Sequence, residues 1–129
     1  MSIKKNPESV EMYLETILKL SQKKPEVHSI DIANEMGFSK PSVSVAMKNL
    51  REEELITMDE LNHIHLTDKG KKIAETILER HSVLTALFKN LGVDPKIAEE
   101  DACRIEHFIS DETFSAIKRH ASEKLNGQF

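Results

Sequence analysis

Residues 28–56, HSIDIANEMGFSKPSVSVAMKNLREEELI, constrain the fold of this chain more than any other segment. Two short runs with apolar residues at helical spacing are separated by Gly37 and the three residues FSK. Ser29 can cap the first predicted helix, and Ser39 can cap the second, which has Pro41 in its first turn. Two short helices joined by a tight turn that contains glycine predict a helix-turn-helix. The first helix has its apolar positions at Ile30, Ile32, Ala33 and Met36, and the second is expected to face a core with Val43, Ala46, Met47 and Leu50.

The next segment, LITMDELNHIHLT (residues 55–67), has the alternating pattern of a β-hairpin, with DELN as its turn. A hairpin that follows a helix-turn-helix is a wing. Amphipathic stretches at 7–22, 68–92, 94–110 and 110–125 predict further helices, with Thr67 and Asp94 as two of the caps. We therefore predict a mostly α protein, with an N-terminal winged helix-turn-helix domain in residues 1–72 and a helical domain in residues 73–129.

The composition indicates an ordered protein of a reducing compartment. Hydrophobic residues make up 39% of the chain and charged residues 31%, which is typical of globular proteins. There is no run of twenty apolar residues, and the start, MSIKKNPESVEMY, lacks the apolar stretch of a signal peptide. The single cysteine excludes an internal disulfide framework. We expect a cytoplasmic protein that does not contact a membrane.

The start of the second helix is the part that a helix-turn-helix presents to the major groove of DNA. Small hydroxyl side chains there can bond phosphates or base edges, and Pro41 can contact a thymine methyl. The net charge of −4 argues weakly against nucleic acid, but local lysines make the phosphate contacts. A serine-rich helix start is also simply a good cap. The hairpin and TDKGKK that follow favour binding to double-stranded operator DNA through Ser39, Lys40, Pro41, Ser42, Ser44 and Lys48.

Cys103, Glu106 and His107 are spaced i, i+3 and i+4 on a predicted helix, so we expect them to share one face. A thiolate, a carboxylate and an imidazole together are typical of a site for a divalent transition metal. Two other interpretations stay open from the residues alone. The first is a buried cysteine beside two surface polar residues. The second is a catalytic Cys–His pair, but no oxyanion-hole loop or orienting third residue is visible, so we expect no enzyme.

The chain as a whole resembles the diphtheria-toxin-repressor and manganese-transport-regulator family of metal-activated repressors. The matching stretches are EMYLETI, DIANEMGFSKPSVSVAMKNL, LTDKGKKIA, ERHSVL and DACRIEHFISDE, which cover most of the chain in order. The resemblance implies a winged-helix lobe and a helical dimerisation lobe with metal between them, and a metal-loaded dimer that represses metal-uptake genes. Larger members have a C-terminal SH3-like domain, and we expect this chain, which stops at Phe129, to lack that contribution.

The resemblance also implies a ligand set. Met12, Cys103, Glu106 and His107 match the primary metal ligands of the iron-type branch. Sulfur ligands shift preference from Mn²⁺ towards Fe²⁺, Co²⁺, Ni²⁺ or Zn²⁺, and the affinity order leaves cellular availability to decide among these. We expect Fe²⁺ as the cofactor, with Mn²⁺ as the alternative and with Zn²⁺, Co²⁺ or Ni²⁺ as substitutes in vitro.

The remaining ligand positions are mixed between the branches. His81 matches a ligand of the neighbouring site in both branches, whereas Glu15 matches a ligand of the manganese branch alone. Glu99 stands where the iron branch has a histidine, and Thr85 where that branch has a glutamate, so the ancillary site is altered. The alternatives are a manganese-responsive regulator and a winged-helix regulator that uses no metal.

Residues 95–125 carry more apolar positions than a small lobe can bury alone. These are Ile97, Ala98, Ile105, Phe108, Ile109, Phe114 and Ile117. We therefore expect a homodimer with two-fold symmetry through this region, in which each protomer presents one recognition helix to a half-site.

Overall fold

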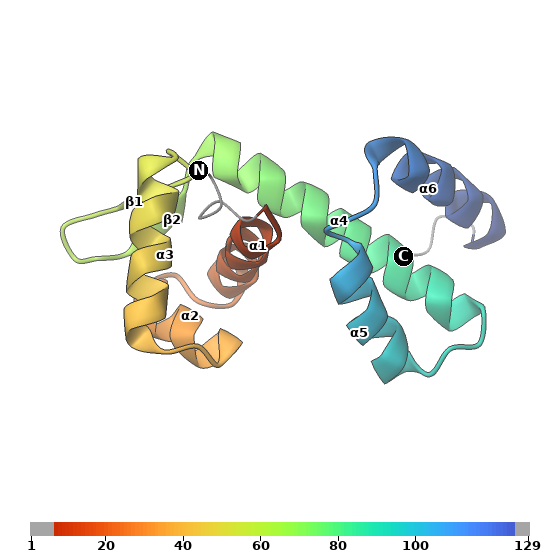
Figure 1. Cartoon of the computed structure of the whole chain (residues 1–129), viewed down its shortest axis with the longest axis horizontal. Helices are drawn as coiled ribbons and strands as arrows, with labels where there is room; N and C mark the ends of the chain where they lie inside the picture. The colour runs from red at the N-terminus through yellow and green to blue at the C-terminus, as the bar shows by residue number, and fades with distance from the viewer. Residues whose placement is uncertain (1–6, 126–129) are drawn as a thin grey trace. The chain divides into compact units, whose positions relative to one another are not determined.

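The computed structural model describes residues 7–125, and Figure 1 shows its helices and strands. These are α1 (Pro7–Lys23), α2 (Ser29–Met36), α3 (Lys40–Glu52), β1 (Ile56–Met58), β2 (Ile64–Leu66), α4 (Asp68–Asn90), α5 (Pro95–Ile105) and α6 (Asp111–Leu125). The predicted fold class, a winged helix-turn-helix followed by helices, is confirmed. Residues 1–6, part of the start that argued against a signal peptide, lie outside the described range. Within that range, no helix combines the length and the apolar character that a membrane crossing requires.

The chain divides into two compact units, one up to Glu75 and one from Thr76, so α4 supplies residues to both. In the N-terminal unit, α2 packs against α1 and α3, while β1 contacts α3 and β2 contacts α1. The two strands are antiparallel, with Ile56 opposite Leu66 and Met58 opposite Ile64. The largest fully buried apolar side chains of this unit are Leu14, Ile17, Ile32, Val43, Met47 and Ile56.

The helix starts follow the capping chemistry of the sequence, with one correction. The Ser39 hydroxyl accepts from the backbone N–H of Ser42, and the Thr67 hydroxyl accepts from that of Gly70, as predicted. Ser29, however, is the first residue of α2 rather than its cap. His28 takes the cap position, and its backbone N–H donates to Asp31 Oδ2 at 2.8 Å. A carboxylate three residues into the helix thus fixes this start.

Gly70 in the first turn of α4 is required by the packing of that turn. A Cβ atom at this position would lie 2.1 Å from the carbonyl oxygen of Leu55. The backbone at Leu55 is also tied to the residue before α4, because the N–H of Thr67 donates to the Leu55 carbonyl oxygen at 3.0 Å. Gly70 lowers the helix propensity of this turn, but because it has no side chain the backbone of Leu55, just before the wing (residues 56–66), can approach the turn closely.

The C-terminal unit is built from the later turns of α4 with α5 and α6. Its core contains Val83, Phe114 and Ala121, with Ile109 and Ile117 packed against them. Asp94 caps α5 as predicted, and the Ser110 hydroxyl accepts from the N–H of Thr113 at the start of α6. The predicted helix over 94–110 is too long, because α5 ends at Ile105 and the chain then turns.

Candidate metal centre and DNA-binding face

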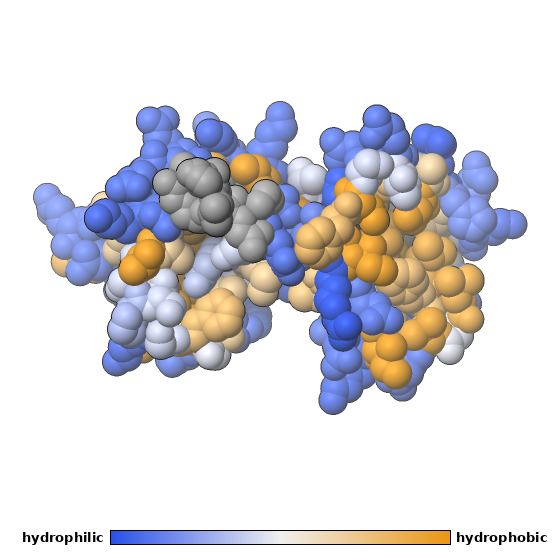
Figure 2. Space-filling model, viewed as in Figure 1, coloured by the Kyte–Doolittle hydropathy of each residue, from blue (hydrophilic) through white to orange (hydrophobic). Residues whose placement is uncertain are grey.

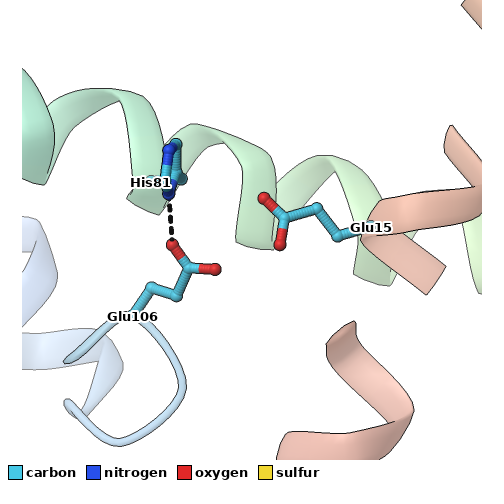
Figure 3. Close-up of side chains that lie close together, drawn as sticks. All are labelled: Glu15, His81 and Glu106. Atoms are coloured by element: carbon cyan, nitrogen blue, oxygen red, sulfur yellow. Dashed lines mark hydrogen bonds and ion pairs between the residues drawn. The ribbon is translucent and has the colours of Figure 1, made fainter. Parts of the chain in front are cut away.

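The C-terminal unit brings His81 of α4 against Glu106, which follows α5. The Nδ1 atom of His81 lies 2.9 Å from Glu106 Oε1, and Figure 3 shows the two side chains pointing toward each other. The Glu106 side chain is completely buried and that of His81 is 16% exposed. A buried carboxylate is costly unless it is hydrogen-bonded, paired or bound to a cation, so this pair has the character of a functional site.

His107 extends this group. Its Nε2 atom lies 3.4 Å from Glu106 Oε2, and its side chain is only 1% exposed. The two residues are placed by the turn that ends α5, where the N–H of Glu106 donates to the Ala102 carbonyl and the N–H of Phe108 donates to that of Ile105. Within the C-terminal unit, Glu106 therefore contacts both imidazoles, one through each carboxylate oxygen. Imidazole and carboxylate are donors that suit a divalent transition metal.

Arg80 holds the segment that carries Glu106 and His107. Its Nη1 atom donates to the backbone carbonyls of Glu106 at 3.0 Å and Ile109 at 2.9 Å, and its Nη2 atom pairs with Asp111. The guanidinium also lies 5.4 Å from the centre of the Phe114 ring. Arg80 and His81 are adjacent on α4. Arg80 fixes the backbone of the turn after α5, and His81 contacts the Glu106 carboxylate that this turn carries.

The other predicted ligands of the C-terminal unit have different environments. Cys103 is exposed, whereas Glu106 and the side chain of His107 are buried. Glu99 is also exposed on α5. Thr85 is 9% exposed, and its hydroxyl has no hydrogen-bond partner among the described residues.

In the N-terminal unit, α1 carries the two remaining predicted ligands. Met12 is half-buried, and its carbonyl accepts from the Thr16 hydroxyl at 2.8 Å. Glu15 is 6% exposed, and its Oε2 atom lies 3.4 Å from Lys19 Nζ one turn further along the helix. Residues three apart on a helix share a face, so Met12 and Glu15 lie on the same side of α1.

The predicted DNA-contacting residues all lie on the exposed side of α3 and its cap, whereas Val43, Met47 and Leu50 are buried. The exposed set is Ser39, Lys40, Pro41, Ser42, Ser44 and Lys48. The hydroxyls of Ser39 and Ser42 are 3.0 Å apart, so part of their hydrogen-bonding capacity is used in the cap. Lys40 and Lys48 are both exposed.

Models of two protein-family domains match most of the chain. The iron dependent repressor N-terminal DNA binding domain matches residues 7–64, and the iron dependent repressor metal binding and dimerisation domain matches residues 67–123. The chain belongs to the iron-dependent repressor family.

Named relatives confirm this resemblance. The transcriptional regulator MntR of Escherichia coli O157:H7 is 35% identical over 111 residues, 86% of this chain and 72% of that protein. The HTH-type transcriptional regulator MntR of Listeria monocytogenes serotype 4b (strain F2365) is 32% identical over 102 residues, 79% of this chain and 72% of that protein.

Solved structures give the same fold. The manganese regulator SloR superposes with a TM-score of 0.75 at 30% identity, covering 92% of this chain and 54% of that chain. A manganese-dependent transcriptional repressor in complex with manganese superposes with a TM-score of 0.80 at 24% identity, covering 88% of this chain and 52% of that chain. The chain thus spans about half the length of these structures.

Two residues of this member of the iron-dependent repressor family, Val45 and Arg80, were not singled out by the sequence. Val45 is 61% exposed on α3, between Pro41 and Lys48 on the side that faces away from the core. An apolar β-branched residue in a helix is ordinarily assigned to the core, so only the burial pattern singles it out. Arg80 could have been found as a charged residue next to His81, but its carbonyl partners are 26 and 29 residues away in sequence.

Proposed function

We propose that this chain is a metal-dependent transcriptional regulator whose metal-loaded dimer binds operator DNA in the cytoplasm and represses metal-uptake genes. The observation that carries this proposal is the buried group of His81, Glu106 and His107, in a chain that also has an exposed recognition helix. We assign DNA binding to residues 1–72, and metal binding and dimerisation to residues 73–129.

The proposed ligands come from both assigned domains. Met12 and Glu15 on α1 would join Cys103 and the buried group, with Glu99 as a weaker candidate at the ancillary site. A cation that takes ligands from both domains binds best to the arrangement that holds those ligands together. If that arrangement also binds DNA best, metal and DNA must tighten each other's binding by the same factor.

Fe²⁺ is the first candidate for the physiological metal, because Met12 and Cys103 are sulfur donors, which suit Mn²⁺ poorly. Mn²⁺ is the second candidate. It is favoured by the names of the relatives and by the carboxylates of Glu15 and Glu106, which are hard oxygen donors.

An exchange of the sulfur donors tests this choice. The double variant Met12→Asp, Cys103→Glu should shift activation of DNA binding from Fe²⁺ towards Mn²⁺, and each single change should weaken the response to both metals. The measurement is DNA affinity against free Fe²⁺ and free Mn²⁺ under anaerobic conditions for all four proteins. Identical metal preference in the parent chain and the double variant would remove the support for iron.

The proposed dimer forms through the C-terminal unit. Figure 2 shows extensive apolar surface on the visible face of this unit. Its exposed large apolar residues are Leu91, Ile97, Ile105 and Phe108, of which Leu91 and Phe108 are each 70% exposed. Exposed apolar surface of this kind marks an interaction site. Light scattering at micromolar protein should give the mass of a dimer, and a monomer there would contradict the proposal.

A further inference from the structure

Val45 places an apolar side chain on the side of α3 that faces away from the core. It is 61% exposed, whereas Val43, two residues earlier on the same helix, is completely buried. A β-branched residue also has a lower helix propensity than alanine, so Val45 does not favour the helix itself. Single exposed apolar residues are common on protein surfaces, and it is the place of Val45 on the helix that calls for an explanation.

Val45 is surrounded on this side of α3 by residues assigned to DNA binding. Residues three and four positions apart on a helix share a face, so Pro41 and Ser42 precede Val45 by one turn and Lys48 follows it by one turn. All three of these neighbours are exposed. Residues 40–51 contain no acidic side chain, so no carboxylate of this stretch opposes the approach of a phosphate.

The two lysines of α3 lie on either side of Val45 along the helix. Lys40 begins the helix and Lys48 lies eight residues later, which is about 12 Å along the axis at 1.5 Å per residue. The major groove of B-DNA is about 12 Å wide, so the two ammonium groups can reach phosphates while the helix lies in the groove. Val45 then faces the base edges between these phosphate contacts.

A valine can recognise only one feature of the base edges in the major groove. Its isopropyl group has no hydrogen-bond donor or acceptor, and the apolar group that base pairs present in this groove is the C5 methyl of thymine. Against cytosine, the same side chain would cover the N4 amino group and leave it without a partner, which costs free energy. Valine in a helix also strongly prefers one χ1 rotamer, so its methyl groups have a fixed direction.

We propose that Val45 is a specificity-determining residue, which selects thymine at one position of each half-site through contact with the thymine methyl group. This inference rests on the proposed binding of operator DNA by α3. The hydroxyls of Ser39 and Ser42, 3.0 Å apart, are partly used by the helix cap, so they offer fewer hydrogen bonds to bases. Base selection by this helix therefore depends on a methyl contact in addition to hydrogen bonds.

The test removes the contact from either side. Operator DNA is selected from random sequences with the full chain and saturating Mn²⁺, or Fe²⁺ under anaerobic conditions, and each thymine of one half-site is then replaced by uracil, which lacks only the methyl group. DNA affinity is measured for the parent chain, Val45→Ala and Lys48→Ala. Val45→Ala should fold, because the side chain is exposed and alanine favours a helix, and thermal denaturation checks this. Lys48→Ala is the matched control, because it removes a charge one turn away on the same face.

In the parent chain, uracil at one thymine position should weaken binding about fourfold, which corresponds to the burial of one methyl group. Val45→Ala should bind the thymine and uracil forms of that position with nearly equal affinity. Lys48→Ala should bind both forms more weakly and retain the fourfold difference.

Equal thymine-to-uracil affinity ratios in the parent chain and Val45→Ala at every position would overturn the assignment of Val45 alone. A parent chain that binds no DNA with either metal would overturn the proposed function and this assignment with it, so the two failures are distinguishable.

Discussion

Replacement of Arg80 by methionine should destabilise the C-terminal unit and its metal group together. Methionine retains the apolar stem of the side chain but removes the guanidinium. The carbonyls of Glu106 and Ile109 then lose their charged donor, and Asp111 loses its partner. The turn that carries Glu106 and His107 would remain attached to α4 through fewer contacts.

The structure gives the magnitude of this effect. A hydrogen bond to a charged group contributes about 1.5–3 kcal/mol, and Arg80 makes two such bonds to carbonyls in a nearly buried setting. The Asp111 side chain is 91% exposed, so its ion pair contributes about 0–1 kcal/mol. Relief from burying the charge offsets part of the loss. We expect Arg80→Met to lower the free energy of unfolding by about 3 kcal/mol, and Asp111→Asn by less than about 1 kcal/mol.

Urea denaturation of the metal-free protein measures both values, and a chelator competition with Mn²⁺ or anaerobic Fe²⁺ measures metal affinity. Arg80→Met should weaken metal binding under conditions in which the protein is still folded, because the turn that carries two ligands is no longer fixed. Arg80→Lys should recover part of the affinity by restoring one carbonyl bond. The reasoning fails if the free energies of unfolding of Arg80→Met and the parent chain differ by less than about 1 kcal/mol. It also fails if Asp111→Asn lowers this free energy as much as Arg80→Met does.

Three further predictions follow from single positions. Gly70→Ala should cost at least about 2 kcal/mol in thermal denaturation, because its Cβ would lie 2.1 Å from the Leu55 carbonyl oxygen; a loss below about 0.5 kcal/mol would contradict this. Lys40→Ala and Lys48→Ala should each weaken specific and non-specific DNA binding alike and reduce the salt dependence by about one charge per half-site; unchanged affinity and slope for both would show that α3 is not in the groove. The pKa of Asp59 is lowered from 3.8 to about 2 by hydrogen bonds from the backbone N–H of His63 and the imidazole of His65. The stability that its carboxylate gives to the wing is therefore fully present above pH 3.8 and is lost as the pH falls towards 2. Amide NMR signals of the wing should persist at pH 4, and their loss at pH 5 would be inconsistent with this pKa.

Local chemistry made most of the fold predictable. The caps at Ser39, Thr67 and Asp94 and the alternation across the hairpin act over a few residues, so a sequence reader can see them. Non-local contacts were harder to predict. The end of α5 at Ile105 has no glycine or proline to mark it, and the turn that follows is fixed by Arg80 from a distant part of α4.

Part of the candidate metal site could also be predicted from the sequence, and part could not. Helical spacing drew attention to Glu106 and His107, which lie in contact, but spacing alone did not show that Cys103 is exposed. Only the resemblance linked His81 to metal binding, at the site next to that of Glu106, because 25 residues separate the two and no periodicity links them. Val45 was missed because its exposure depends on which face of α3 the other helices cover.

The central claim is that metal binding controls DNA binding, and one measurement tests it directly. Operator DNA is first selected from random sequences with the full chain and metal, and its affinity is then measured across a range of free Fe²⁺ and, separately, free Mn²⁺. We predict that one of these ions tightens DNA binding, that DNA tightens binding of that ion by the same factor, and that Glu106→Gln abolishes both effects. DNA affinity that is independent of both metals in the parent chain would contradict the account.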